Sequence, residues 1–272
     1  MPDRMSPEAA LALMPAVREA VRAAAAIALP FFKPGAETSA RVWSKAGGSP
    51  VTEADVEVDA FLKVRLSELL PEAAWLSEET RDDPVRLEHD LVWIVDPIDG
   101  TRAFLSGHRD WSIAVALLSV GQPVLGIVDA PACRHSYEAV AGHGAFRDGA
   151  PIRVSSRTTL PGARVTGPKP LFNRLARGVA PGGDAGFERI ERIPSLALRV
   201  ARVADGAIDV GLVSKDARDW DLAGADLILR EAGGAVCDLA GRPTLYNRPD
   251  PVHGELIAAP AGLIGGIVAA LG

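Results

Sequence analysis

Two aspartates stand at the end of an apolar run, with a proline directly after the first of them. The segment reads Leu91-Val92-Trp93-Ile94-Val95-Asp96-Pro97-Ile98-Asp99-Gly100-Thr101. Its apolar residues predict a buried strand, which should end at Asp96 because Pro97 cannot donate to a ladder. Carboxylates and main-chain carbonyls suit a hard cation such as Mg²⁺, and free N–H groups at a helix start suit a phosphate. The segment therefore indicates a metal-assisted phosphatase site; the alternative is a turn with solvated acids.

This segment resembles the signature of one enzyme family. Asp96 to Thr101 is similar to the motif of the inositol monophosphatase superfamily, whose members are magnesium-dependent, often lithium-sensitive phosphomonoesterases. Partner motifs follow in the family's order along nearly the whole chain. The resemblance implies that Asp96, Asp99 and the Ile98 carbonyl hold metal. It also implies that the N–H groups of Gly100 and Thr101 hold the phosphate oxygens.

A threonine and an aspartate nearer the N-terminus have two interpretations. Thr52 and Asp55 are spaced as in a helix-capping box, and the amphipathic run from Val56 to Leu70 supports a helix there. Asp55 would then only stabilise the helix start. The resemblance instead implies that Asp55 partners Thr101 and that the pair orients and deprotonates the attacking water. We favour the catalytic role, since a cap does not exclude it.

Paired acids follow a short apolar strand just before the signature, at Glu78 and Glu79. Adjacent acids alone are a weak signal because most such pairs are solvated. The resemblance implies that Glu78 binds metal and that Glu79 supports it.

A loop rich in glycine and serine extends from Pro34 to Ser49, and Gly47-Gly48 would let it move. In the superfamily the matching loop carries metal and closes on the phosphate. By that resemblance Lys45 would steady phosphate charge. A solvated lysine is the alternative.

A further acid, Asp221, stands in the sequence Trp220-Asp221-Leu222-Ala223-Gly224. It lies at an expected helix start, where a negative charge is favoured. The resemblance makes Asp221 the distal metal ligand. Gathering Glu78, Asp96, Asp99 and Asp221 without a cation would be costly, since like charges disfavour joint ionisation. We therefore interpret the cluster as a Mg²⁺ site. We expect two or three ions here, and the resemblance implies inhibition by Li⁺.

Several residues bear on the substrate. Many inositol-phosphate members carry a glutamate seven positions before the distal aspartate, where this chain has Ser214. That departure argues against inositol selectivity. Lys215 and Arg218 put positive charge nearby, which suits a substrate with more than one phosphate. Ser195 resembles an element of the 3'(2'),5'-bisphosphate nucleotidases, the branch often called CysQ, and would either bond substrate or cap a helix.

These features favour a nucleotidase that removes the 3'-phosphate of adenosine 3',5'-bisphosphate. The alternatives are an inositol-1-phosphatase or a related sugar- or histidinol-phosphate phosphatase with the same metal core. A catalytically silent metal- or nucleotide-binding regulator is a third interpretation. It is disfavoured because the whole expected set is present: Asp55, Glu78, Asp96, Asp99, Thr101 and Asp221.

The composition limits the remaining classes. The chain has 272 residues, 48% of them hydrophobic, with a net charge of -6, which allows a large core and gives no basic footprint for a nucleic-acid polymer. No segment is long and apolar enough to suggest a membrane span. Two cysteines far apart favour a reducing cytoplasm over a disulfide framework. We expect a small phosphate ester as partner, and a homodimer is left open.

The expected fold is mixed α/β. Residues 1–158 predict an N-terminal half of helices and an antiparallel sheet that holds most metal ligands. Residues 159–272 predict an α/β half that contributes Asp221 and substrate contacts. Stacked together, the halves suggest a five-layered α/β/α/β/α sandwich of the inositol monophosphatase and fructose-1,6-bisphosphatase type, which the resemblance also implies. The site would lie between them.

Overall fold

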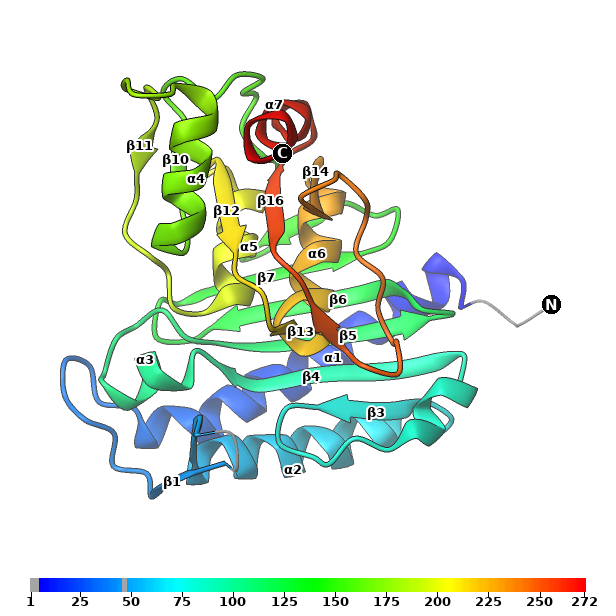
Figure 1. Ribbon diagram of the computed structural model, residues 1–272. Coiled ribbons are helices and arrows are strands. Elements are labelled where there is room, and N and C mark those ends of the chain that lie inside the picture. The colour runs from blue at the N-terminus through cyan, green and yellow to red at the C-terminus, as the bar shows by residue number, and fades with distance from the viewer. Residues whose placement is uncertain (1–4, 46–47) are drawn as a thin grey trace.

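The computed structural model describes residues 5–45 and 48–272, and its elements form five stacked layers (Figure 1). The layered α/β/α/β/α sandwich is confirmed: two helices, a large sheet, two helices, a small sheet and two helices. The helices are α1 (Pro7–Ala28), α2 (Glu53–Leu69), α3 (Thr101–Leu105), α4 (Lys169–Val179), α5 (Leu196–Ala204), α6 (Asp219–Glu231) and α7 (Ala261–Leu271), with 3-10 turns η1 (Leu29–Phe31) and η2 (Pro84–Glu88).

The large sheet has seven strands, in the order of the chain. They are β3 (Ala74–Ser77), β4 (Leu91–Asp99), β5 (Ser112–Ser119), β6 (Gln122–Ala130), β7 (His135–Val140), β8 (Ala145–Arg147) and β9 (Ala150–Ile152). Only β3 and β4 pair in parallel; the other neighbours are antiparallel. Helices α1 and α2 cover one face, and α5 and α6 cover the other (Figure 1).

The small sheet has five strands in the order β11-β10-β12-β16-β14, and it packs on the far side of α5 and α6. Helices α4 and α7 cover its outer face. The strands are β10 (Arg164–Thr166), β11 (Glu188–Arg189), β12 (Val210–Val213), β14 (Gly234–Asp238) and β16 (Leu256–Pro260). Two short antiparallel pairs complete the described fold: β1 (Val42–Ser44) with β2 (Pro50–Thr52), and β13 (Ala217–Arg218) with β15 (Val252–His253).

The two sheets lie on either side of residue 158 in the sequence. One apolar core nevertheless spans them, because α5 and α6 bury side chains against both. The division into halves at 1–158 and 159–272 stays a prediction.

A bulge in β4 turns two acids toward the same space. Asp96 lies opposite Ala114 on β5, whereas Asp99 lies opposite Ser112, so the register slips between them. Side chains three residues apart in a regular strand point to opposite faces, and the extra residue of a bulge corrects this. The expectation that the strand ends at Asp96 is wrong: the strand continues to Asp99, because Pro97 lies in the bulge, where no ladder bond is required.

Helix α6 lies unusually close to the large sheet. A Cβ at Gly224 would lie 2.8 Å from the Val115 carbonyl oxygen, and one at Gly126 would lie 2.6 Å from the Gly224 oxygen. Only glycine permits such an approach of backbone to backbone. Because Asp221 precedes Gly224 by about one turn, the close contact brings its carboxylate toward the end of β4.

Candidate metal centre

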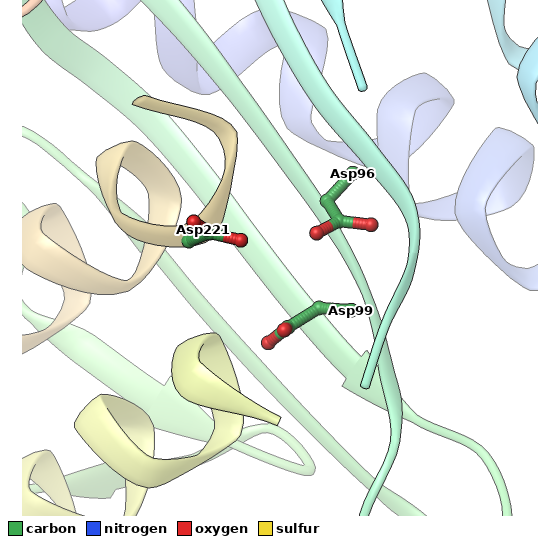
Figure 2. Close-up of side chains that lie close together, drawn as sticks. All are labelled: Asp96, Asp99 and Asp221. Carbon is green, nitrogen blue, oxygen red and sulfur yellow. The ribbon is translucent and has the colours of Figure 1, made fainter. Parts of the chain in front are cut away.

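Three carboxylates from distant parts of the chain converge at the end of β4. Asp96 and Asp99 come from the bulge and Asp221 from the first turn of α6, and Figure 2 shows them facing a shared space. One oxygen of each lies within 4.8 Å of an oxygen of the others. Oxygens so close can share a hard cation.

One carboxylate oxygen of Asp96 is buried without a hydrogen-bond donor among the described residues. Asp96 is 1% exposed; its Oδ1 accepts from the Ile98 N–H at 3.1 Å, whereas its Oδ2 has no partner among the described residues. Burial, and then the charges of Glu78 and Asp99, hold the pKa of Asp96 well above its usual range. Burial and the charge of Asp99 likewise raise the pKa of Asp221. A buried, unpartnered carboxylate oxygen beside other acids fits a cation.

Residues at the start of α5 donate hydrogen bonds to Asp99. Its Oδ2 accepts from Ser195 Oγ at 2.5 Å and from the Ala197 N–H at 2.6 Å. Burial raises the pKa of Asp99 to about 6, and these donors oppose the rise. Ser195 is fully buried and caps α5 by accepting from the Leu198 N–H. Of its two expected roles, the cap is therefore the one observed, and its hydroxyl serves Asp99 instead of facing substrate.

The expected water-orienting pair is in contact. Asp55 Oδ2 accepts from the Thr52 N–H at 2.8 Å and from Thr52 Oγ1 at 2.5 Å, which closes the capping box at the start of α2. Thr101 Oγ1 donates to the Ile98 carbonyl at 3.1 Å and lies 3.3 Å from Asp55 Oδ1. Burial raises the pKa of Asp55 to about 6. The same aspartate thus caps a helix and reaches Thr101.

The paired acids after β3 share one lysine. Lys45 Nζ lies 2.8 Å from Glu78 Oε1 and 2.7 Å from Glu79 Oε1. Burial raises the pKa of Glu79 to about 7 despite the lysine. Glu78 lies outside the group of three close carboxylates but lines the same cavity. Gly47, on which the expected loop movement partly rests, lies outside the described residues.

A cavity of about 330 Å³ opens over the acids. Gly100 has φ +90° and is the N-cap residue of α3, and with Thr101 it forms part of the cavity wall. The lining residues are Ser49, Pro50, Glu78, Asp96, Asp99, Gly100, Thr101, Arg102, Ala103, Arg192, Pro194 and Asp221.

The cations that line this cavity differ from those expected. Lys215 is exposed outside the lining, and the Arg218 guanidinium lies over the Trp220 ring, 5.8 Å from its centre. Arg102 and Arg192 line the cavity instead, and sequence reasoning missed both. Arg102 directly follows the signature, so its position was a usable signal. The segment around Arg192 carries no periodic pattern that would have marked it.

Comparison with known proteins relates the whole chain to one family. The sequence pattern described as "Inositol monophosphatase family" matches residues 13–271. The 3'(2'),5'-bisphosphate nucleotidase CysQ of Aggregatibacter actinomycetemcomitans is 31% identical over 78% of this chain and 80% of that protein. A histidinol-phosphatase of Chlorobaculum parvum is 30% identical over 98% of each. An IMPase structure from Thermotoga maritima superposes with a TM-score of 0.79 at 26% identity, over 93% of this chain and 94% of that one.

The chain belongs to the inositol monophosphatase family, as the motifs implied, and it is a phosphatase. Its relatives bear nucleotidase and histidinol-phosphatase names at nearly equal identity, so family membership alone leaves the substrate open. None of the helices in the described residues has the length and apolar character that crossing a bilayer requires.

Proposed function

We propose that this phosphatase is Mg²⁺-dependent and removes the 3'-phosphate of adenosine 3',5'-bisphosphate. The observation that carries the metal requirement is the convergence of Asp96, Asp99 and Asp221, with oxygens within 4.8 Å and one buried oxygen of Asp96 unpartnered. Asp96, Asp99 and Asp221 would hold the metal, with Glu78 and the Ile98 carbonyl completing the set. When bound, two or three Mg²⁺ ions supply Lewis-acid activation of phosphate and water, and Li⁺ competing there would inhibit.

Side-chain and backbone groups of the chain would activate the water and orient the phosphate. The Thr101 hydroxyl has one proton, which can turn toward the Ile98 carbonyl or toward Asp55 Oδ1, and its free lone pair would accept from the attacking water. As Thr101 Oγ1 takes the water proton, the hydroxyl proton would move to Asp55 Oδ1, which is ionised near neutral pH because its pKa is about 6. The N–H groups of Gly100 and Thr101 would orient the phosphate oxygens. Lys45 would exchange its contact with Glu78 for the phosphate.

Two observations favour the nucleotide. CysQ proteins are among the relatives at 31% identity, and two arginines line the cavity. A histidinol-phosphatase is the second candidate, because that relative aligns over 98% of the chain. We also expect a cytoplasmic location, which the free thiols Cys133 and Cys237 suit. The possibility of a homodimer stays a prediction.

A phosphate-release panel tests the proposal. Adenosine 3',5'-bisphosphate, inositol 1-phosphate and histidinol phosphate would be compared with Mg²⁺ and with a chelator, using wild type and Asp96→Asn. We expect release to be fastest from the bisphosphate, to require Mg²⁺, and to vanish in the variant. Wild-type turnover by Asp96→Asn would refute the metal site. Faster release from histidinol phosphate would refute only the choice of substrate.

A further inference from the structure

Two of the residues that line the cavity are arginines, Arg102 and Arg192. Both are exposed, and across residues 5–45 and 48–272 neither side chain has a hydrogen bond or ion pair. Other arginines of the fold, such as Arg18, Arg147 and Arg202, each contact a carboxylate at 2.7 Å or less. Uncommitted guanidinium groups at the mouth of a site are ready to bind an anion, which they can grip with two parallel bonds.

The backbone around Arg192 is fixed on both sides. The Thr166 hydroxyl donates to the Glu191 carbonyl at 2.9 Å. The buried Arg199 donates Nε and Nη2 to the Ile193 carbonyl at 3.1 and 2.6 Å. A third bond runs from Arg199 Nη1 to the carbonyl of Leu212 on β12, at 3.1 Å. Arg192 is therefore an exposed side chain on a rigid support, which lowers the entropic cost of binding.

Arg192 reaches the cavity from a different segment than the groups that would bind the cleaved phosphate. Gly100, Thr101 and the β4 acids are neighbours along the chain, and Arg102 follows them directly. Arg192 comes from the segment before α5, and Pro194 of that segment also lines the cavity. Of the two arginines, Arg192 is therefore the one whose segment is not already assigned to the cleaved phosphate.

We propose that Arg192 is the specificity-determining residue of this enzyme and binds a second anionic group, a phosphate or carboxylate, on the leaving group. This inference rests on the proposed function, because it takes the acids as the site of the cleaved phosphate. It assigns to Arg192 the role that the sequence suggested for Lys215 and Arg218. The Arg192 guanidinium would select against a neutral polyol, which leaves the guanidinium unpaired. It would also select against a cationic leaving group such as histidinol, which it repels.

A pair of substrates that differ by one phosphate tests the assignment. Adenosine 3',5'-bisphosphate and adenosine 3'-monophosphate share the cleaved ester and differ only in the 5'-phosphate. For Arg192→Ala we expect kcat/KM on the bisphosphate to fall about 10- to 100-fold, mostly through KM, because one charge-assisted contact is lost. On the monophosphate kcat/KM should change less than about twofold, since the lost contact was never made. Arg192→Lys should restore part of the preference.

A matched control is Arg189→Ala. It removes an exposed guanidinium from the same segment, one that lies over the Phe172 ring at 5.1 Å and outside the cavity. We expect its substrate preference to match wild type. An equal loss on both substrates in Arg192→Ala, or no loss on either, would overturn the inference.

A binding measurement keeps the two proposals separable. Calorimetry with adenosine 5'-monophosphate needs no turnover, and its affinity should weaken about tenfold or more in Arg192→Ala. If wild type hydrolyses neither nucleotide, the proposed substrate fails. Fructose 1,6-bisphosphate against fructose 1-phosphate then replaces the nucleotide pair. Unchanged preference there, together with unchanged nucleotide affinity, would refute the role of Arg192.

Discussion

Asp219 and Asp221 stand two residues apart on α6 and face opposite electrostatic conditions. Asp219 is fully buried, with Oδ1 2.7 Å from His253 Nε2 and Oδ2 accepting from the Asn247 N–H at 2.7 Å. Asp221 accepts from the Arg218 N–H at 2.6 Å and opens onto the cavity beside two other acids. One acid thus has a donor for each oxygen, whereas the other has acids as neighbours.

The contrast separates a charge that the fold satisfies from one that we propose binds a metal ion. The network around Asp219 continues through Asn247, whose Oδ1 accepts from the buried Arg86 Nη1 at 2.6 Å, so it ties α6 to the turn before β4. Buried charges persist in folded proteins when donors satisfy them. The acids around Asp221 instead repel one another, and either proton uptake or a bound cation relieves that repulsion. The hydrogen-bonded network around Asp219 therefore helps to hold the start of α6, and with it Asp221, in place.

The largest effect should come from Asp221→Asn. Removing one of the proposed metal carboxylates should lower kcat/KM about 1,000-fold or more, because metal stabilisation of the transition state is worth several kcal/mol. In chelator the variant should unfold at the same temperature as wild type or higher, since the substitution relieves buried repulsion. Phosphate release and thermal unfolding measure the two properties. A variant that keeps its activity would place the distal ligand elsewhere.

The matching substitution at Asp219 should lower the stability of the fold. Asp219→Asn leaves His253 and Asn247 with a weaker partner, and we expect the free energy of unfolding to fall by about 2 kcal/mol. Activity per folded molecule should stay near that of wild type, because Asp219 is outside the cavity lining. Denaturant unfolding and assays on folded protein check this. If Asp219→Asn lost turnover but kept its stability, the division between paired and unpaired acids would be wrong.

Local patterns predicted much of this arrangement. The capping spacing of Thr52 and Asp55, the helix start at Ser195 and the buried run before Asp96 are all found. Each depends on residues within a few positions of one another, which periodicity and capping rules can detect. The convergence of Asp221 with the β4 acids came from resemblance and not from any pattern within the chain.

The remainder depends on contacts between distant segments. Ser195 meets Asp99 across 96 positions, and Lys45 meets Glu78 across 33. No local spacing encodes such pairs, because they depend on how distant segments pack in the folded chain. Arg192 was missed for the same reason: only the folded chain places it at the cavity.

The smallest effect should come from Ser195→Ala, which tests how the paired groups support the unpaired ones. Losing the hydroxyl that donates to Asp99 should raise the Mg²⁺ concentration for half-maximal binding about tenfold, as loss of a group behind a metal ligand typically does.

The pKa of Asp99 is about 6, and Ser195 opposes the rise that burial causes. Mg²⁺ needs the ionised carboxylate, so binding should strengthen as pH rises through this range. Without the hydroxyl the pKa rises further, and the binding profile should move to higher pH. Ser6→Ala is the matched control, since Ser6 caps α1 by accepting from the Ala9 N–H and is remote in sequence from the acids. Calorimetric Mg²⁺ titrations across pH measure both the change in affinity and the shift of the pH profile. Equal profiles for the two variants would show that Ser195 acts only as a helix cap.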